Sequence, residues 1–269
     1  MVTLSAFGDE IAADLTEQMD VLEAEDVRYI ELRGVWRKNV LDLDNRQLDM
    51  IREEVEDREF GISAIGSPIG KVAVAGDPEE HLRRFQRALD AAGVLGTDYI
   101  RIFSFYLPEG EPADPYRDMV MDRLRSFYVR AEEEKIVLLH ENEKRIYGET
   151  PERCEEIFEA IDTPFLRATF DIANFIQAGI RPYEDAFPRL KDKIEYMHIK
   201  DARLSDGQVV PVGQGDGRVR DLLADLLEEG FDGFLCVEPH LSGMSGPDAF
   251  QTAVRALKEI LDDIGAEYV

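Results

Sequence analysis

The stretch Ile194-Glu-Tyr-Met-His-Ile-Lys-Asp201 is the best guide to how the chain folds. Apolar and aromatic residues lead up to His198 and Lys200, and Asp201 begins a polar loop. Residues two apart on a strand point to the same side, so His198 and Lys200 share a face if this segment is a buried strand. The stretch therefore predicts a strand that carries two polar groups at its carboxyl end.

Three other predicted strands also end on an ionisable residue, and these residues are Glu141, Asp171 and Glu238. In chain order, Glu141, Asp171, His198 and Glu238 are separated by 30, 27 and 40 positions. Each separation is about the length of one strand-plus-helix unit. The four side chains therefore belong to consecutive strands. If those strands are parallel neighbours, their carboxyl ends meet at one edge and the four side chains converge.

Strand-like and helix-like segments alternate along the whole chain, and no two strands follow each other directly. We predict eight strands, at residues 3–7, 29–32, 62–66, 99–103, 136–141, 166–171, 194–200 and 234–238. Such alternation indicates parallel strands with helical crossovers, and eight units in roughly 250 residues are typical of a closed (β/α)8 barrel. The rival, an open doubly wound sheet, usually has a glycine-rich nucleotide loop after its first strand; Gly8-Asp-Glu-Ile11 has no such pattern. No linker divides the chain, so residues 1–269 are predicted to form one domain.

The composition limits the location and partners of the protein. The chain contains 57 acidic and 31 basic residues, for a net charge of −26, and only 8 of the basic residues are lysines. Acidic residues spread over all the predicted helices indicate a halophilic protein, because high salt screens their repulsion. The same charge argues against binding of nucleic acid. The absence of a long apolar segment, of a secretory signal and of a disulfide pattern predicts a cytoplasmic protein that does not enter the membrane.

Three carboxylates and one imidazole at the strand ends predict a metal site. Such an oxygen-rich set suits Mn²⁺, Mg²⁺ or Co²⁺ in octahedral geometry, and Zn²⁺ is a further option; we expect Mn²⁺ first. Taken singly, each residue has a simpler explanation, because a carboxylate after a strand often caps the next helix and a lone histidine is usually structural. Buried side by side without a cation, however, the four groups would cost several kcal/mol per charge.

Other polar residues near the strand ends are candidates for substrate binding. Lys200 shares a face with His198 and is predicted to bind a substrate oxygen, although a surface lysine beyond the strand end is the alternative. Arg203 and His240, which lie in loops at the same end, and Asn174, which follows the strand that ends at Asp171, are further candidates. We expect His140, which alternates with Glu141, to pack toward the helices, and His81 to be a solvated helix residue.

Several longer motifs resemble the xylose isomerase-like TIM-barrel superfamily, and within it the sugar phosphate isomerase/epimerase family. They are Ser67-Pro-Ile-Gly-Lys71, Phe170-Asp-Ile-Ala-Asn-Phe-Ile-Gln-Ala-Gly179, His198-Ile-Lys-Asp-Ala202 and Gly230-Phe-Asp-Gly-Phe-Leu-Cys-Val-Glu-Pro-His240. The resemblance extends over nearly the whole chain. It implies that the metal ligands are Glu, Asp, His and Glu at the ends of strands five to eight, which here are the four residues already singled out.

The resemblance also implies a reaction. The expected enzyme moves a proton on a ketose or related polyol through a metal-bound enediolate, with Glu141 and Glu238 as base and acid on opposite faces of the substrate. Ketose epimerases of this family often have a histidine three residues after the ligand aspartate, where this chain has Asn174. An inosose dehydratase-type lyase is therefore the alternative.

Two other classes of protein share this barrel. An endonuclease IV-like repair enzyme needs several zinc-binding histidines and a surface that binds DNA. This chain has only four histidines and a net charge of −26, which argues against that class. A non-catalytic barrel that binds a metal or a sugar would not need both glutamates. The expected partner is a small sugar or polyol, and the sequence leaves open whether the chain forms a homo-oligomer. No glycine-rich phosphate cradle is evident, which favours an unphosphorylated substrate.

Overall fold

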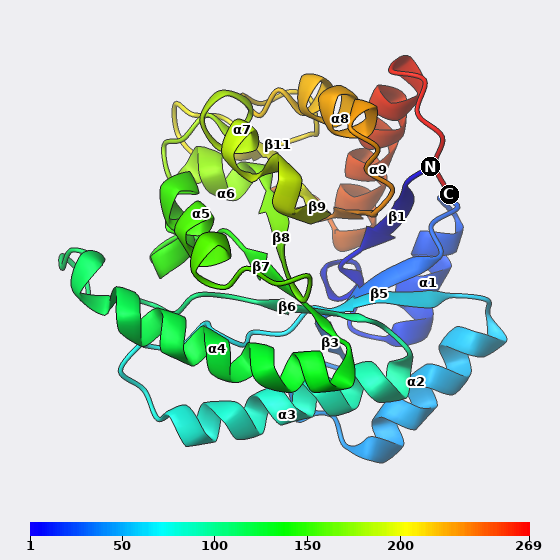
Figure 1. Ribbon diagram of the computed structural model, residues 1–269. Helices are drawn as coiled ribbons and strands as arrows, with labels where there is room; N and C mark the ends of the chain where they lie inside the picture. Colours follow the sequence, from blue (N-terminus) through cyan, green and yellow to red (C-terminus); the bar gives the residue numbers. More distant parts are fainter.

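Eight parallel strands close into a barrel that helices surround (Figure 1). The computed structural model describes residues 1–269. Around the barrel the strands pair in the order β1-β12-β9-β8-β7-β6-β5-β2. The strands are β1 Thr3–Ala6, β2 Tyr29–Leu32, β5 Gly61–Ile65, β6 Tyr99–Ile102, β7 Val137–Glu141, β8 Leu166–Asp171, β9 Ile194–Ile199 and β12 Phe234–Val237. Each strand therefore lies beside the next one in the chain, and the predicted (β/α)8 barrel is confirmed.

The predicted strands match the observed ones to within one residue at each end. The small differences are mostly at the carboxyl ends, where Phe103, Lys200 and Glu238 follow the last paired residue of their strands. Strand ends are the least sharply defined part of an element, because pairing stops where the chain turns away. These side chains consequently stand on the rim of the barrel.

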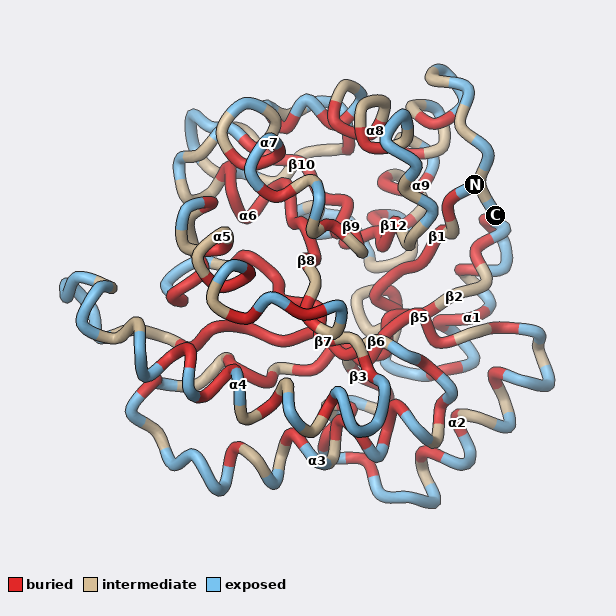
Figure 2. The backbone as a smooth tube through the Cα atoms, viewed as in Figure 1, coloured by how far each residue is buried: buried red, intermediate tan, exposed pale blue.

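The helices cover the outside of the barrel and bury one face each. They are α1 Leu15–Glu23, α2 Asn45–Asp57, α3 Pro78–Leu95, α4 Arg117–Glu134, α5 Pro151–Ala160, α6 Ile172–Gln177, α7 Phe187–Leu190, α8 Val219–Glu228 and α9 Gly246–Asp263. Figure 2 shows buried residues along the strands and the inner sides of the helices, with exposed residues on the outer sides. None of the helices has both the length and the apolar composition that a membrane span requires.

Two helices begin with a capping side chain followed by a proline. The carboxylate of Asp77 accepts the backbone N–H groups of Glu79 and Glu80, and Pro78 occupies the first helical position of α3. Thr150 caps α5 in the same way, again with a proline at the first position. Each such cap satisfies a donor that the helix itself cannot, and it stabilises the helix by about 1 kcal/mol.

Buried side chains fill the barrel beneath its carboxyl end. Phe7, Ala64, Leu139, Tyr196 and Cys236 form a small inner cluster without solvent exposure. The Tyr196 hydroxyl lies 2.8 Å from that of Ser63, which in turn lies 2.6 Å from that of Ser5, so the polar atoms in this interior have partners. The barrel is thus a packed core with a floor, and any ligand must enter from the rim.

A polar loop after β9 is tied down by one carboxylate. Asp201 accepts the backbone N–H groups of Ala202, Gly213, Gly215 and Gly217 at 2.9–3.0 Å. A Cβ atom on Gly215 would lie 2.3 Å from a carboxylate oxygen of Asp201, which explains the glycine. The aspartate of the His198–Ala202 motif therefore shapes the loop over the site and contributes no group to the site itself.

Two short hairpins were not predicted: β3 Gly34–Val35 with β4 Lys38–Asn39, and β10 Asp201–Ala202 with β11 Val209–Val210. Both lie in loops that follow barrel strands. Runs of two residues are too short to give a period in the sequence.

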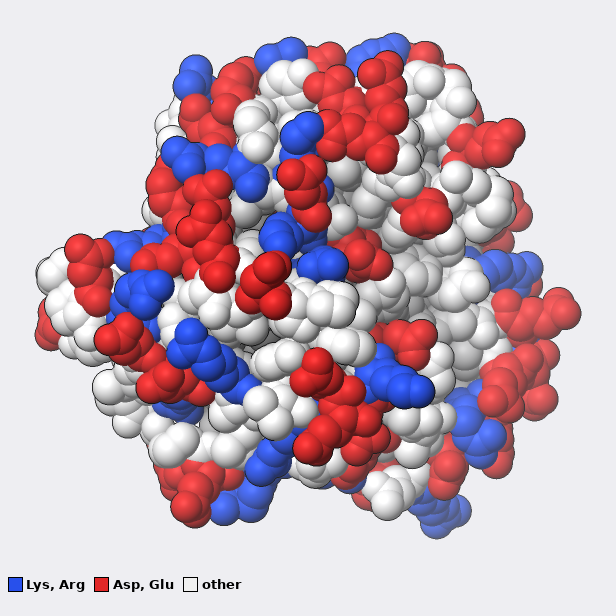
Figure 3. Space-filling view, viewed as in Figure 1, with Lys and Arg blue, Asp and Glu red and all other residues white.

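Acidic side chains are spread over the surface with basic ones between them, as Figure 3 shows for one face. Many of the basic groups are paired; Arg58, for example, contacts Asp20 at 2.8 Å and Glu23 at 2.6 Å. Exposed pairs of this kind contribute little individually. With 57 carboxylates and 31 cations, most of the surplus negative charge has no partner.

We therefore predict that stability rises with salt concentration. Raising KCl from about 0.1 M to about 1 M shortens the screening length from roughly 10 Å to roughly 3 Å, which weakens the repulsion between surface carboxylates. Thermal unfolding followed by circular dichroism should show a midpoint several degrees higher in the concentrated salt. A midpoint that stays constant or falls as KCl is added would contradict a halophilic adaptation.

Candidate metal centre and active site

The structure brings the four predicted strand-end residues together. One ligand atom from each of Glu141, Asp171, His198 and Glu238 can be chosen so that all four lie within 4.8 Å of one another. All four side chains are buried, with at most 6% of any residue exposed. They come from β7, β8, β9 and the residue after β12, so closure of the barrel places them on one arc of its rim.

Several of their polar atoms have no hydrogen-bond partner. Glu141 Oε2, Asp171 Oδ2 and His198 Nδ1 are buried without one. Each of these atoms lies 3.1–3.3 Å from a charged neighbour, but none of these contacts has hydrogen-bond geometry. Buried polar atoms without a hydrogen bond are rare in proteins and call for an explanation. The other oxygen of Asp171 accepts the N–H of Asn174 at 2.7 Å and so caps α6. One oxygen of Asp171 therefore acts as a helix cap, and the other is free to act as a metal ligand. The four side chains together offer oxygen and imidazole ligands, a set that fits a divalent cation.

Two buried cations lie among these carboxylates. Lys200 Nζ lies 3.1 Å from Asp171 Oδ2 and also contacts Glu238, and Arg101 Nη1 lies 3.2 Å from Glu141 Oε2. Both side chains are 5% exposed or less. The sequence analysis missed Arg101; its signal was an arginine inside the apolar run of 99–103. Lys200 and Arg101 thus neutralise part of the negative charge of the carboxylate cluster.

These two cations and His198 determine which carboxyl groups are ionised. Burial would lower the pKa of His198, but Glu141 and Glu31 outweigh it and raise that pKa to about 10, so the ring is positively charged beside these carboxylates. Burial alone would raise the pKa of Glu141, but His198 and Arg101 outweigh it and lower that pKa to about 2. The pKa of Glu238 also lies well below its usual value, because Lys200 above all outweighs the effect of burial. Burial dominates at Asp171, where it raises the pKa to about 7 despite the nearby Lys200. Glu141 and Glu238 are therefore both ionised at neutral pH.

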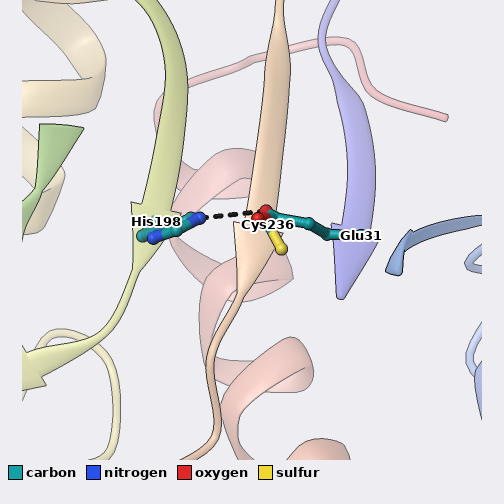
Figure 4. Close-up of side chains that lie close together, drawn as sticks. All are labelled: Glu31, His198 and Cys236. Carbon is teal, nitrogen blue, oxygen red and sulfur yellow. Dashed lines mark hydrogen bonds and ion pairs between the residues drawn. The ribbon is translucent and has the colours of Figure 1, made fainter. Parts of the chain in front are cut away.

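A further carboxylate, that of Glu31, bonds the ring nitrogen of His198 that points away from the cluster. Glu31 on β2 is 1% exposed, and its Oε2 atom lies 2.9 Å from His198 Nε2. Figure 4 shows this contact next to the side chain of Cys236, with the three residues on three different strands. The contact leaves His198 Nδ1 3.3 Å from Glu141 and 3.8 Å from Asp171. A carboxylate that bonds the second nitrogen of a ligand histidine is the arrangement that orients such ligands in metal sites.

Glu31 was not predicted, although a glutamate inside the apolar run of 29–32 was a signal that could have found it. Cys236, together with Glu31 and His198, makes a second group of ligand-type atoms within 4.8 Å. Burial holds the pKa of the Cys236 thiol well above its usual value, so the sulfur adds no negative charge to these side chains.

A cavity of about 270 Å³ opens above the cluster, and no hydrophobic side chain lines it. Its lining includes three of the predicted substrate-binding residues, Lys200, Asn174 and His240. Asn174 donates to Glu141 Oε1 at 3.1 Å, and His240 lies 3.4 Å from Glu238. Arg203 does not line the cavity, since its guanidinium pairs with Asp206 at 3.1 Å in the neighbouring loop. Its predicted contact with substrate gains no support from this position.

One histidine prediction is wrong and another agrees with the structure. His81 is buried in the face of α3, with 6% exposed, and its Nε2 accepts the N–H of Gly70 at 2.9 Å. The helix pattern did not reveal that the loop before α3 folds back onto this position. His140 is buried toward the helices, with its ring 6.0 Å from that of Phe158.

The fold and the site together define a (β/α)8 barrel with a candidate metal centre at the carboxyl ends of its strands. The family model for the xylose isomerase-like TIM barrel matches residues 19–260, and the chain belongs to that family.

Among curated proteins, the fructoselysine 3-epimerase of Escherichia coli O157:H7 is 25% identical over 170 residues. The match spans 60% of this chain and 61% of that protein's length. Among solved structures, a D-tagatose 3-epimerase-like protein superimposes with a TM-score of 0.80 at 21% identity, covering 97% of this chain and 98% of that one. The IOLI protein, solved with a zinc atom bound, gives 0.79 at 19% identity, with 97% and 98% covered. At these identities the two structures show the shared fold.

Removal of Glu31 should weaken metal binding. We predict that Glu31→Gln lowers the affinity for Mn²⁺ by about 10- to 100-fold, because outer partners of ligand histidines typically have effects of that size. Asp171→Asn removes a proposed ligand, so it should lower the affinity for Mn²⁺ by a larger factor than Glu31→Gln. Isothermal titration of Mn²⁺ into metal-free protein measures both changes, with the surface variant Glu23→Gln as the control. Wild-type affinity in a folded Glu31→Gln protein would contradict the assignment.

His81 should make the protein sensitive to acid. Burial above all, with the nearby positive charges of Arg123 and Arg84, lowers the pKa of His81 from 6.5 to about 4. The neutral ring accepts the Gly70 N–H inside the protein. Above pH 6.5 neither state binds the proton, and as the pH falls toward 4 the unfolded state binds it first, so stability is lost over this range. We predict a smaller loss for His81→Gln than for wild type. Urea unfolding at several pH values measures both, and equal losses would contradict the prediction.

Proposed function

We propose that the protein is a metal-dependent sugar isomerase or epimerase that transfers a proton on a ketose or related polyol. The observation that carries the proposal is the pair Glu141 and Glu238. Both carboxylates are buried beside the cavity and ionised at neutral pH, and β8 and β9 separate their strands around the rim. Two proton acceptors on either side of one small polar cavity suit chemistry at a single carbon.

In this proposal Glu141, Asp171, His198 and Glu238 hold the metal ion. When bound, a divalent cation supplies Lewis-acid stabilisation of the negative charge that develops on substrate oxygens as the carbon beside the carbonyl loses a proton. The ligand set suits Mn²⁺ first, with Mg²⁺, Co²⁺ and Zn²⁺ as alternatives. The zinc atom in the related IOLI structure supports a divalent ion at a barrel of this kind.

The two glutamates then divide the work. In an epimerisation one carboxylate removes the proton from one face of the carbon. The other carboxylate takes up a proton from solvent through the open cavity and delivers it to the opposite face, which inverts the centre. An aldose–ketose isomerisation can reuse a single group. Asn174 keeps Glu141 in position through its 3.1 Å hydrogen bond, and the Lys200 ammonium offers a donor to a substrate oxygen in the cavity. We propose His240, at the entrance, as a further substrate contact.

A dehydratase-type lyase acting on a keto-inositol is the second candidate, and Lys200 is the observation that favours it. Its ammonium lies beside Glu238 in the cavity wall. In a dehydration a carboxylate takes the proton from the carbon beside the carbonyl, and an acid protonates the hydroxyl that leaves the next carbon as water. Lys200 is placed to be that acid.

The relatives agree with a sugar substrate. The curated relative is a fructoselysine 3-epimerase and one structural neighbour is a D-tagatose 3-epimerase-like protein. A cavity of about 270 Å³ with mainly polar and charged lining residues suits a small polyhydroxylated molecule better than a strand of nucleic acid. The absence of a nucleic-acid partner remains a prediction from the acidic composition. A cytoplasmic location remains a prediction from the lack of a long apolar segment, a secretory signal and a disulfide pattern.

The proposal predicts that Glu141→Gln and Glu238→Gln each lower turnover by about 100-fold or more, the size of effect that one acid–base group supplies. Ketoses and inososes are incubated with the Mn²⁺-loaded protein in D₂O, and deuterium incorporation at carbon is followed by NMR. Epimer, aldose or dehydrated product separates the reaction types. The exposed Glu152→Gln on α5 is the control. Deuterium exchange at the wild-type rate in both glutamate variants would refute the roles given to these residues. If the wild-type protein exchanges no proton on any of the ketoses or inososes, a binding protein is favoured.

A further inference from the structure

The active-site cavity has the opposite charge balance to the protein that surrounds it. Five of its lining side chains are arginine or lysine and three are glutamate, whereas the whole chain has 31 basic and 57 acidic residues. Three of the eight lysines in the chain, Lys71, Lys144 and Lys200, line this one cavity. A concentration of scarce cations inside a polar cavity suggests recognition of negative charge.

The cations deep in the cavity have partners of their own. Arg101 and Lys200 face the carboxylates of the metal centre, as described above. Arg33 lies 2.9 Å from Asp9 and 2.8 Å from Glu10, and 3.8 Å from Glu238. These three side chains are committed to the proposed catalytic centre and the carboxylates around it.

The two lysines nearer the entrance share one carboxylate between them. Lys71 Nζ lies 2.9 Å from one oxygen of Glu143, and Lys144 Nζ lies 4.0 Å from the other. The second contact of Lys144 is the neutral amide of Gln177. Both lysines are partly exposed, at 30% and 44% of their side chains. Two positive charges against one negative charge leave this group, the entrance lysine pair, with a net positive charge.

Lys71 is held in place, unlike an ordinary surface lysine. Its ammonium lies 4.2 Å from the centre of the Phe103 ring, a favourable cation–π contact. The loop that carries it is fixed by the hydrogen bond from Gly70 to His81 and by the 2.8 Å bond from Phe103 N–H to the Ile69 carbonyl. A cation that is positioned before binding loses less entropy when it meets a ligand.

The backbone of the loop offers no amide cradle for an anion. The N–H groups of Gly66, Ser67 and Lys71 are already donated to the carbonyls of Leu32, Ile65 and Pro68 at 2.7–2.9 Å. Ligand pockets usually have a mostly apolar lining with few polar groups, and this cavity has no hydrophobic lining residue. Recognition of an anion here therefore depends on charged side chains.

We propose that the substrate carries an anionic group, a carboxylate or a phosphate ester, which the entrance lysine pair Lys71 and Lys144 binds while the keto end of the substrate reaches the metal centre. The substrate class is then a keto sugar acid or a ketose phosphate. This inference rests on the proposed function for the identity of the keto end. The anionic group displaces Glu143 from the lysines or binds to the positive charge that Glu143 leaves uncompensated.

The test uses the full chain loaded with Mn²⁺ and three matched ligands: D-fructose, D-fructuronate and D-fructose 6-phosphate. Isothermal titration at one ionic strength gives the affinity for each, and the carboxylate and phosphate arms tell the two anions apart. We expect one anionic ligand to bind at least 10-fold more tightly than D-fructose. In Lys71→Gln/Lys144→Gln that preference should vanish. The control is Lys193→Gln, which removes a lysine just before β9, at the other end of the barrel, where it pairs with Asp162.

Equal affinities for the three ligands, immeasurably weak ones included, would overturn the inference, as would a preference for the anion that survives in the double variant. Thermal unfolding of each variant shows that the fold is kept. Deuterium exchange measured on the same samples separates this inference from the proposed function. Exchange on D-fructose without any preference for the anions means that the anion site fails and the proposed function stands. If the anion binds more tightly in a lysine-dependent way but no deuterium is exchanged, the anion site stands and the proposed function fails.

Discussion

Three carboxylates buried on one arc of the barrel rim are the constraint on which the rest of this structure depends. Glu141, Asp171 and Glu238 cannot stay ionised together in a dry interior without positive charge close by. In the structure that charge comes from Arg101 and Lys200, which reach the carboxylates from neighbouring strands. Glu141 Oε2, Asp171 Oδ2 and His198 Nδ1 still make no hydrogen bond. A divalent cation would supply further positive charge and use these atoms as ligands.

The groups around the cluster make its geometry specific. Glu31 bonds one nitrogen of His198 and so directs the other toward the carboxylates. Asp171 uses one oxygen to cap α6, which fixes the direction of the second. Asn174 binds Glu141 from the same helix. Each proposed ligand that has such a partner is held in one orientation by the fold, which is the condition for a well-formed metal site.

Charge also differs between the outside of the protein and its cavity. The surface carries a large excess of carboxylates, yet cations outnumber carboxylates in the lining of the cavity. In a low-dielectric recess a small local excess of positive charge acts more strongly on a ligand than the screened charges outside. At high salt, where the distant carboxylates are screened, the entrance lysine pair and the candidate metal centre would dominate the electrostatic potential that the proposed anionic substrate meets.

Local patterns in the sequence were enough to predict the eight strands and the convergence of Glu141, Asp171, His198 and Glu238. A parallel barrel repeats one unit, so residues about one unit apart at strand ends must become neighbours. The contacts of Glu31 and Arg101, the burial of His81 and the position of Arg203 outside the cavity needed the tertiary structure. Glu31 and His198 are 167 residues apart, and no local pattern determines which side chains meet across a closed barrel.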